Sequence, residues 1–208
     1  MTDIAVIDYG MGNLRSVSKA LEHVAPAISV AVTSDPDVIA KAKRVVFPGV
    51  GHAGDCMREL DARGLRQAVI EAARSKPFLG ICLGMQMLFE HSEEGDTDCL
   101  GILPGSVQRF PAEAMVDETG NKLKVPHIGW NALVSTADSR ALNGTLLDGM
   151  PQHSAVYFVH SFAAQPTQVS DRLADCVYGG HRICAAIQRG NVMATQFHPE
   201  RSAQAGLG

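Results

Sequence analysis

Three side chains of this sequence have the types and the order expected of a nucleophile, a base and an orienting carboxylate. Cys82 lies in a Gly-x-Cys-x-Gly turn, and His198 and Glu200 stand far downstream in a His-Pro-Glu run. A lone cysteine is more often a small buried hydrophobe, and a lone His-Pro-Glu run is more often a surface turn. Together, a thiol, an imidazole and a carboxylate are the parts of covalent catalysis through a thiolate. The combination therefore favours an enzyme.

The elements around Cys82 are expected to make its thiol reactive. Residues 77–81 are apolar and predict a buried strand, whereas residues 83–90 are rich in helix formers and contain no proline. The thiol then lies at a helix N-terminus, where unpaired N–H groups and the macrodipole favour the thiolate. Gly80 and Gly84 leave room for a sharp turn, as in the Gly-x-Ser-x-Gly nucleophile elbow with sulfur in place of oxygen.

The base is expected at the end of another strand. Residues 191–197 form an apolar run with weak alternation, and Pro199 cannot continue a sheet ladder. His198 then projects from a strand terminus, and Glu200 follows it in a loop. This placement suits an imidazole that moves protons and a carboxylate that orients it.

Apolar and helical patterns alternate in the first part of the chain and predict a parallel sheet with crossover helices. These runs are 3–9, 13–23, 28–32, 44–48, 55–74 and 77–81. Later apolar runs have few helical intervals and predict antiparallel additions to the sheet edge; they are 106–110, 132–135, 155–159, 173–178, 183–189 and 191–197. We expect one α/β domain over residues 1–208, with a mostly parallel sheet flanked by helices. Cys82 and His198 would then lie outside the carboxyl ends of strands, where reactive groups gather in such sheets.

Composition and charge narrow the class of protein. The chain has 208 residues, of which 46% are hydrophobic and 19% charged, as is ordinary for a globular protein with a full core. A net charge of −4 without a basic run argues against nucleic acid or an anionic membrane as the main partner. No apolar stretch approaches the ~20 residues that span a bilayer, and the N-terminus does not resemble a signal peptide. We therefore expect a cytoplasmic protein.

Two further patterns point away from metals and nucleotides. Five cysteines, an odd number without a Cys-x-x-Cys pair, and histidines without i, i+4 pairing indicate no disulfide framework, no metal site and no cofactor. Residues 10–15 partly match a dinucleotide fingerprint, but Arg15 replaces the third glycine. Asp35, after the next strand, is better explained as a turn or helix cap. A tight strand-to-helix loop is the better interpretation of residues 10–15.

The catalytic runs also resemble a known family. Gly-Ile-Cys-Leu-Gly-Met-Gln at 80–86 and Gln-Phe-His-Pro-Glu at 196–200 are similar to the signatures of class I glutamine amidotransferases. Within that class, the runs at 47–52, 126–131 and 157–162 resemble the glutaminase subunits of imidazole glycerol phosphate synthase; His-Ile-Gly-Trp-Asn at 127–131 is the most specific marker. The resemblance covers nearly the whole chain and implies a flavodoxin-like fold and a role in histidine biosynthesis.

The resemblance implies a glutaminase mechanism for the three catalytic candidates. The Cys82 thiolate would attack the side-chain carboxamide of L-glutamine, His198 would carry protons, and Glu200 would orient the imidazole. The products would be glutamate and ammonia. The oxyanion would meet the N–H of Leu83 and a donor from the glycine-rich loop that contains Val50 and Gly51.

Further residues match family positions that bind substrate. They are Gly49, Gly51, Gln86, Glu94, His160, Ser161 and Phe162. Without the resemblance, Glu93 and Glu94 would be taken as part of a solvated loop. Phe162 stands where the family also has tyrosine, so a contact through a phenol oxygen would be lost while a backbone contact would survive.

The resemblance also implies a partner, because ammonia released into water would mostly become unreactive ammonium. The partner would be a TIM-barrel cyclase subunit, in a heterodimer, which converts a phosphoribulosyl-formimino carboxamide ribotide into imidazole glycerol phosphate and an aminoimidazole carboxamide ribotide. Candidates for the interface and the ammonia gate are Asn13, His127, Trp130, Tyr157 and Arg201. Position 201 is commonly lysine in the family, and arginine is not an equivalent substitute in a tight gate.

Two alternatives and one irregularity accompany this interpretation. The chain could serve another class I amidotransferase, such as one for anthranilate, guanylate or carbamoyl phosphate, or could be a catalytically silent subunit whose Cys82 is an oxidation-sensitive thiol. Family members continue past His-Pro-Glu through a final helix. Here residues 202–208 begin such a helix and stop, so we expect a truncated C-terminal helix.

Overall fold

The computed structural model describes residues 2–136 and 142–208. Its largest sheet has the strand order β2-β1-β3-β4-β14-β13-β12-β9. The first five strands in this order run parallel and are β2 (Val30–Thr33), β1 (Ile4–Ile7), β3 (Arg44–Gly49), β4 (Phe78–Cys82) and β14 (Val192–Thr195). This order is the flavodoxin-like one, and it confirms the predicted parallel sheet.

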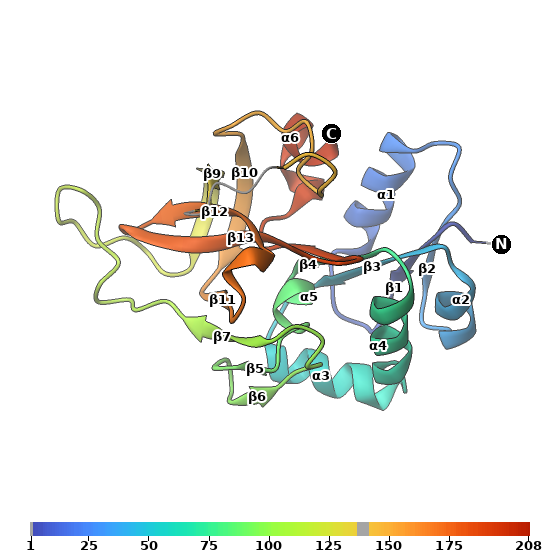
Figure 1. Cartoon of the computed structure of the whole chain (residues 1–208). Coiled ribbons are helices and arrows are strands. Elements are labelled where there is room, and N and C mark those ends of the chain that lie inside the picture. The colour runs from blue at the N-terminus through green and yellow to red at the C-terminus, as the bar shows by residue number, and fades with distance from the viewer. Residues whose placement is uncertain (1, 137–141) are drawn as a thin grey trace.

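Helices cover both faces of the parallel strands (Figure 1). On one face, α1 (Leu14–Val24) packs against Ile4 and Val6 of β1. On the other face, Ala5 and Ile7 of the same strand pack in the core cluster to which α2 (Pro36–Lys41), α3 (Ala53–Ala62) and α4 (Arg66–Ser75) contribute. Because successive side chains of a strand point to opposite faces, a continuously apolar strand needs this double cover.

Asp35 directly precedes α2, and Gly64 follows the end of α3. Asp35 caps α2, and its carboxylate accepts a hydrogen bond from the N–H of Asp37 at 2.8 Å, which confirms the helix-cap interpretation. The single helix expected at residues 55–74 is wrong: α3 ends at Ala62 and α4 begins at Arg66. Gly64 has a φ of +66° in the connection, a conformation that glycine adopts without steric cost and that ends α3.

Antiparallel strands extend the sheet on one side. Strand β13 (His181–Arg189) pairs with β14, β12 (Arg172–Tyr178) pairs with β13, and β9 (Val134–Ser135) pairs with β12. The expectation that every later run joins this edge is wrong. Two smaller sheets form instead, one of β10 (Ala155–His160) and β8 (His127–Ala132), the other of β11 (Phe162–Pro166), β7 (Gly105–Arg109), β5 (His91–Ser92) and β6 (Thr97–Asp98). The short elements α5 (Leu83–Gln86), η1 (Val169–Asp171), η2 (Pro199–Arg201) and α6 (Ala203–Leu207) complete the described elements.

An aromatic group supports the end of β3, beside the site. The rings of Tyr9, Phe47 and Phe78 pack in sequence with centroid separations of 5.4 and 6.0 Å, and each side chain is fully buried. The hydroxyl of Tyr9 donates a hydrogen bond to the carbonyl of Pro48 at 2.9 Å. This bond fixes the point at which β3 turns into the glycine-rich loop, because it satisfies the one polar group of a side chain that otherwise lies in the core.

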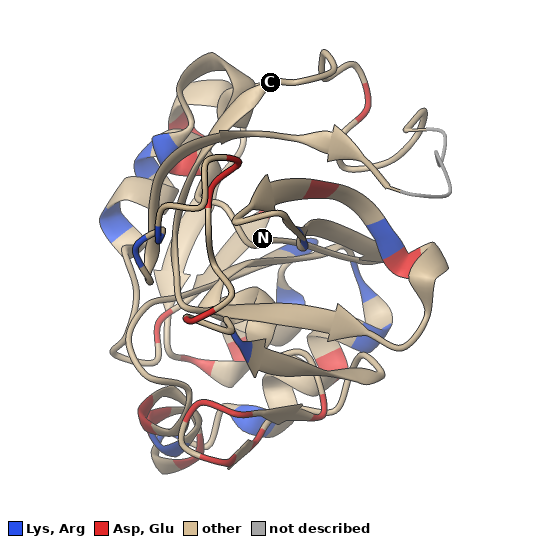
Figure 2. Ribbon diagram, turned by 90° about the vertical axis from the view of Figure 1, so that its left-hand side faces the viewer, with Lys and Arg blue, Asp and Glu red and all other residues tan. Residues whose placement is uncertain are grey.

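Charge is spread over the molecule without segregation by sign. Lys and Arg alternate with Asp and Glu along helices and connections (Figure 2). Of the helices in the described parts of the chain, none has the length and apolarity needed to cross a membrane. Within the same residues, the search for groups of three or more His, Cys, Asp or Glu side chains that could hold a metal ion finds none.

Candidate active site

The backbone of Cys82 has the strained geometry of a nucleophile elbow. Cys82 ends β4 with φ 54° and ψ −112°, a region that residues with a β-carbon rarely adopt. The turn is possible because its neighbours are glycines. A β-carbon on Gly84 would lie 1.9 Å from the carbonyl oxygen of Phe47, and one on Gly80 would lie 3.1 Å from that of Gly84. The predicted strand-turn-helix is therefore present.

The helix after the elbow is much shorter than predicted. The sequence predicts a helix over residues 83–90, but α5 (Leu83–Gln86) is a single turn. Beyond it, the N–H groups of Leu88 and Phe89 donate to carbonyls three residues earlier, in the tighter 3₁₀ pattern. Since one turn aligns few peptide dipoles, the macrodipole contributes less to thiolate formation than the sequence suggested. A thiolate at Cys82 would therefore need stabilisation by other groups.

Gly49 packs closely against the backbone of the elbow at Cys82. It pairs with Cys82 in the β3–β4 register. A β-carbon at Gly49 would lie 2.7 Å from the hydroxyl of Tyr9 and 2.8 Å from the backbone nitrogen of Gly84. Gly49 does not line the cavity beside the thiol, whereas its neighbours Val50 and Gly51 do. The role of Gly49 is therefore to allow close packing of the backbone, and Gly49 does not contact a ligand directly.

The imidazole and the carboxylate form a hydrogen-bonded pair. Strand β14 ends at Thr195, so His198 does not project from the strand itself; it caps η2, and Glu200 lies inside that short helix rather than in a loop. The Nδ1 atom of His198 lies 2.9 Å from Oε1 of Glu200, and the two side chains are 3% and 2% exposed. An ionised carboxylate only accepts, so Nδ1 carries the proton and Nε2 is directed elsewhere.

Polar contacts hold this pair against β10. The N–H of His198 donates to the carbonyl of Tyr157 at 2.9 Å. The hydroxyl of Ser202 donates to the carbonyl of His198 at 2.6 Å and accepts from the N–H of Tyr157 at 2.9 Å. Among the residues that the structure describes, only His198 Nε2 and Glu200 Oε2 are buried side-chain nitrogen or oxygen atoms without a hydrogen-bond partner. Unused polar atoms of this kind are costly unless a ligand or a reaction uses them.

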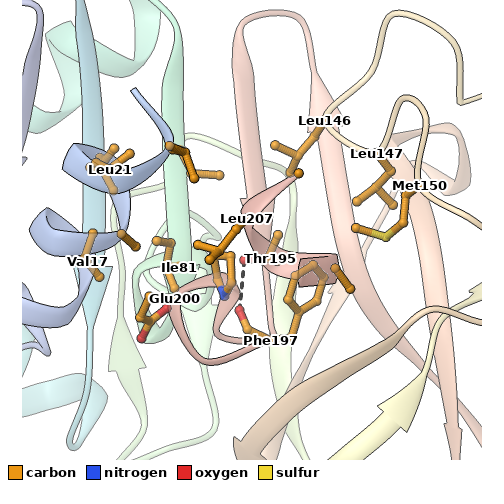
Figure 3. Close-up of a pocket in the computed structure, with 18 residues that line it drawn as sticks. Val17, Leu21, Ile81, Leu146, Leu147, Met150, Thr195, Phe197, Glu200 and Leu207 are labelled. Carbon is orange, nitrogen blue, oxygen red and sulfur yellow. Dashed lines mark hydrogen bonds between the residues drawn. The ribbon is translucent and has the colours of Figure 1, made fainter. Parts of the chain in front are cut away.

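The electrostatics favour a protonated imidazole. Burial opposes a charge on His198, but the contacts with Cys82 and Glu200 outweigh it and raise the pKa of His198 above its ordinary value. Glu200 also lines a second, largely apolar cavity of about 240 Å³ between α1 and α6 (Figure 3). An apolar surrounding strengthens the attraction between carboxylate and imidazolium because it screens charge less than water does.

A cavity of about 270 Å³ opens beside the thiol. Its lining residues come from the elbow, the glycine-rich loop, the connection after β5, and the segment between β10 and β11: Val50, Gly51, Cys82, Leu83, Gln86, Glu94, Pro126, Val159, His160, Ser161, Phe162 and His198. The structure thus brings together the predicted nucleophile, base, oxyanion loop and substrate positions, apart from Gly49 below and Glu200 behind the imidazole. Sequence reasoning assigned no role to Pro126 or Val159.

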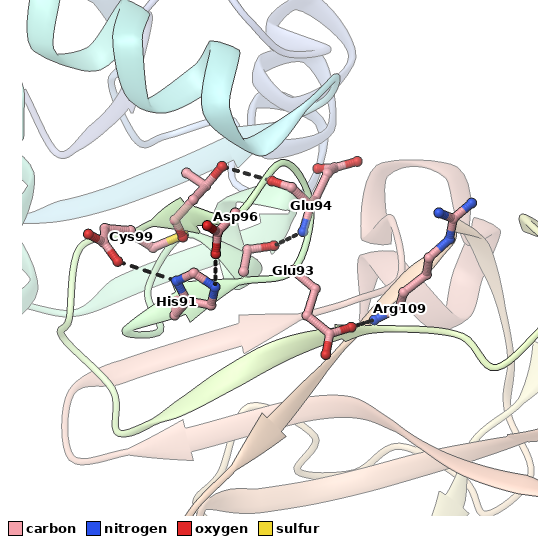
Figure 4. Close-up of polar contacts among 9 residues, drawn as sticks. His91, Glu93, Glu94, Asp96, Cys99 and Arg109 are labelled. Atoms are coloured by element: carbon pink, nitrogen blue, oxygen red, sulfur yellow. Dashed lines mark hydrogen bonds and ion pairs between the residues drawn. The ribbon is translucent and has the colours of Figure 1, made fainter.

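Glu94 is fixed in place rather than solvated. Its Oε2 accepts a hydrogen bond from the N–H of Ala53, at the start of α3, at 2.7 Å. Its carbonyl accepts from the hydroxyl of Thr97 at 2.7 Å, whereas Glu93 accepts from the N–H of Arg109 at 2.7 Å. The two glutamates therefore point apart (Figure 4). The solvated-loop alternative does not hold for Glu94, whose carboxylate is available at the cavity wall.

The carbonyl of Phe162 accepts the hydrogen bonds that fix the segment from His160 to Phe162. Gln86 donates an amide hydrogen to the carbonyl of Phe162 at 3.0 Å, and His160 Nδ1 lies 2.8 Å from the same oxygen. Burial lowers the pKa of His160 to about 3, so this ring is neutral at physiological pH. A neutral imidazole at the cavity wall serves as a hydrogen-bonding group and not as a charge.

The proposed interface residues divide into exposed and buried ones. Trp130 is 54% exposed, with its ring 6.0 Å from that of Tyr157, and the guanidinium of Arg201 lies 4.4 Å from the centre of the Tyr157 ring. Asn13 stands directly before α1 and is partly buried. His127 is only 3% exposed and stacks on other aromatic rings. Its side chain therefore acts at this surface only through its neighbours.

One polar side chain at the nucleophile has no role in the sequence-based interpretation. Gln196 is fully buried, and its Nε2 lies 3.8 Å from the Cys82 sulfur. It belongs to the same run as His198, and a buried glutamine at the end of an apolar strand is unusual for its residue type. A polar glutamine within the apolar run 191–197 was the signal in the sequence that could have identified Gln196.

Comparison with known proteins shows the family to which the chain belongs. A family model described as glutamine amidotransferase class-I matches residues 5–206, and the chain belongs to that family. A solved structure described as a glutamine amidotransferase superposes with a TM-score of 0.71 over 98% of this chain and 94% of that one. At 18% identity, this likeness shows the fold alone.

Closer relatives define the branch of the family. The chain is 63% identical over 205 residues to the imidazole glycerol phosphate synthase subunit HisH of Thiobacillus denitrificans, covering 99% of this chain and 87% of the relative. It is 58% identical over 207 residues to the HisH subunit of Aromatoleum aromaticum, covering 100% and 95%. Within the class I glutamine amidotransferases, the chain therefore belongs to the HisH family.

Proposed function

We propose that this chain is the glutaminase subunit of an imidazole glycerol phosphate synthase, with Cys82 as nucleophile, and that it passes ammonia to a cyclase subunit. The observation that carries the proposal is the meeting of a strained thiol, an imidazole and a buried carboxylate at one cavity. The Nδ1 of His198 is committed to Glu200 at 2.9 Å, which leaves Nε2 for the thiol. The relatives are named as imidazole glycerol phosphate synthase subunits, which supports a role in histidine biosynthesis.

In the first half of the reaction, the sulfur of Cys82 attacks the side-chain carboxamide carbon of glutamine. The negative oxygen that forms is stabilised by the N–H of Leu83 and a donor from the loop of Val50 and Gly51. The thiol of Cys56 donates a hydrogen bond to the carbonyl oxygen of Val50, with a sulfur–oxygen distance of 3.6 Å. Since the C=O and N–H of a trans peptide point in opposite directions, the N–H of Gly51 points away from Cys56. This orientation supports Gly51 as the second donor.

In the second half, the C–N bond breaks and a thioester forms. His198 gives its proton to the departing nitrogen, which leaves as ammonia. The imidazole then takes a proton from water, and the resulting hydroxide attacks the thioester. Glutamate leaves and the thiolate is regenerated, so one glutamine and one water yield one glutamate and one ammonia. Glu200 stabilises the imidazolium throughout.

Substrate recognition is assigned to the remaining cavity wall. Glu94 carries the negative charge that would attract the α-ammonium of glutamine. Gln86 has both amide hydrogens engaged, one with Phe162 and one with Gln196. Gln86 would therefore offer only its carbonyl oxygen to a ligand. That oxygen can bind a hydrogen-bond donor of glutamine but not the α-carboxylate, which only accepts. The carboxylate would be bound by backbone groups of the segment that contains Ser161.

The surface of β8 supports the proposed partner. Ile128 and Trp130 alternate with inward residues of the strand and are 59% and 54% exposed. Val50, at the cavity, is 38% exposed. Exposed apolar residues of this size are typical anchors of protein interfaces. We place the TIM-barrel cyclase subunit on this surface, in a heterodimer, with Tyr157 and Arg201 beside the path of ammonia.

Two alternatives are less well supported. A subunit of another class I amidotransferase would not match HisH relatives over nearly the full chain. A silent subunit would not need to keep the strained φ of 54° at Cys82 together with a buried His198–Glu200 pair. Strain of this kind persists where a function requires it.

The proposal is tested by glutamate release from glutamine. The assay compares the chain alone with the chain plus a cyclase subunit and its ribotide ligand, beside a Cys82→Ala control. We expect stimulation by the loaded cyclase and no activity in the control. Equal activity without the partner would contradict the coupled role, and activity in the control would contradict the nucleophile.

A further inference from the structure

We propose that Gln196 is a positioning residue of the nucleophile, whose side-chain N–H donates to the sulfur of Cys82 and favours the thiolate. The inference rests on the proposed role of Cys82. The Gln196 amide adds to the effect of His198, which lies beside the sulfur, because the single turn of α5 gives little dipole and the carbonyl of Val159 lies 4.0 Å from the sulfur. A carbonyl stabilises a thiol but repels a thiolate.

The direction of the Gln196 amide follows from one backbone carbonyl. The oxygen of Phe162 can only accept, so the Gln86 atom 3.0 Å from it must be the nitrogen. The second hydrogen of that nitrogen points to Gln196 at 2.9 Å, so the Gln196 atom there must be the oxygen. The nitrogen of Gln196 is then the atom 3.8 Å from the Cys82 sulfur. The sulfur therefore faces a donor.

A second branch of hydrogen bonds fixes the same carbonyl. His160 Nδ1 donates to the oxygen of Phe162 at 2.8 Å, which makes Nε2 an acceptor. Nδ1 of His127 lies 3.3 Å from that Nε2 and must be the donor. Asn131 then donates to His127 Nε2 at 3.5 Å. A fully oriented network, rooted in β8 and β10, thus holds the oxygen that sets the direction of Gln196.

Other ionisable groups also surround the sulfur and act in every variant described below. They are His198 with Glu200 behind it, Tyr9 beneath the elbow, and His160 and Glu94 at the cavity wall. None of them is changed when Gln196 is replaced. A difference in thiol reactivity between the wild-type chain and a Gln196 variant therefore reports the amide.

The test is the rate of alkylation of Cys82 by iodoacetamide as a function of pH, followed peptide by peptide by mass spectrometry. The other four cysteines are buried, and burial raises the pKa values of Cys56 and Cys99 to about 11 and of Cys176 and Cys184 to about 12. They react slowly at neutral pH. No glutamine is involved, so the readout is independent of the proposed glutaminase activity.

Gln196→Met keeps the volume and removes the donor, and Gln196→Glu keeps the shape but places a carboxyl group beside the sulfur. The matched control is Thr195→Val, which removes a buried hydrogen bond to the carbonyl of Phe197, at 2.9 Å, without touching the thiol (Figure 3). We expect an alkylation pKa about one unit higher in Gln196→Met, hence about tenfold slower alkylation at pH values below the pKa of both chains. We expect a further rise in Gln196→Glu and no change in Thr195→Val.

Glutamine kinetics give the second readout. Gln196→Met should lower kcat and leave KM nearly unchanged, because Gln196 does not line the cavity and the bond to the carbonyl of Phe162 still orients Gln86. An unchanged alkylation profile in a folded Gln196 variant, or an equal shift in Thr195→Val, would overturn the proposal. If Gln196→Met does not fold, the isosteric Gln196→Glu decides by the same profile. Wild-type alkylation that depends on Gln196 without any glutaminase activity would contradict the proposed function and leave this inference standing.

Discussion

The strained backbone of Cys82 makes a prediction about stability that reverses the usual order of two substitutions. At ordinary positions alanine is more stable than glycine by about 0.5–1 kcal/mol, because glycine loses more conformational freedom on folding. Cys82 has φ 54° and ψ −112°, a region where a β-carbon costs about 1–3 kcal/mol. Cys82→Ala keeps this strain and Cys82→Gly releases it.

The difference between the two variants should therefore be nearly zero or favour glycine. Relative to an ordinary position, the shift is the strain itself, about 1–3 kcal/mol. For a chain of this length, 1 kcal/mol corresponds to about 2–4 °C in Tm. We expect Cys82→Gly to unfold at the same temperature as Cys82→Ala or a few degrees above it. Both variants lack the thiol and should be inactive.

The assay is thermal or urea-induced unfolding of both variants beside a control pair. Glu71 is exposed in the middle of α4, so Glu71→Ala should exceed Glu71→Gly by about 1 kcal/mol. The strain argument is refuted if alanine exceeds glycine at position 82 by as much as it does at position 71.

Three further predictions follow from contacts already described. Gly84→Ala should prevent folding or lower Tm strongly, because its β-carbon would lie 1.9 Å from the carbonyl oxygen of Phe47; an unchanged Tm would contradict the elbow geometry. Glu200→Gln should lower kcat by about 100-fold or more with little change in KM, whereas Glu93→Gln, matched in chemistry but bound to a backbone N–H, should be nearly silent. Burial lowers the pKa of His160 to about 3, so as pH falls below about 6.5 the unfolded chain binds a proton at this residue and the folded chain does not. The free energy of unfolding should therefore decrease as pH falls over this range. His160→Asn should reduce the slope of the unfolding free energy against pH by about 1.4 kcal/mol per pH unit. An equal slope in His160→Asn would count against a neutral, buried His160.

The parts of the site that could be predicted from the sequence depend on local chemistry. A cysteine between two glycines after an apolar run, and a histidine followed by proline and glutamate, define short segments whose geometry needs few distant contacts. The same holds for Gly51, because glycine can adopt the positive φ that such a loop after a buried strand needs; Gly51 has a φ of 113°. These segments meet at the carboxyl ends of β3, β4 and β14, as the parallel topology requires.

The parts that could not be predicted depend on contacts between distant segments. The sequence predicts no strand over 127–131, and only the pairing of β8 with β10 shows that Ile128 and Trp130 face outward while His127 is buried. Helix formers after Cys82 favoured a long helix, but the carbonyls of Met87, Leu88 and Phe89 accept hydrogen bonds from N–H groups of the distant segment 100–103. The direction of the Gln196 amide depends on Phe162, which belongs to a different sheet.

The most direct test of the central claim is covalent labelling with an electrophilic analogue of glutamine, such as a diazoketone that replaces the carboxamide. The account predicts one adduct per chain, located on Cys82, suppressed by excess glutamine, and absent in Cys82→Ala. Labelling should be slow in Glu200→Gln, where the imidazole is no longer held by a carboxylate. An adduct on any of the other four cysteines, or glutamine turnover in a chain that takes up no label at Cys82, would contradict the account.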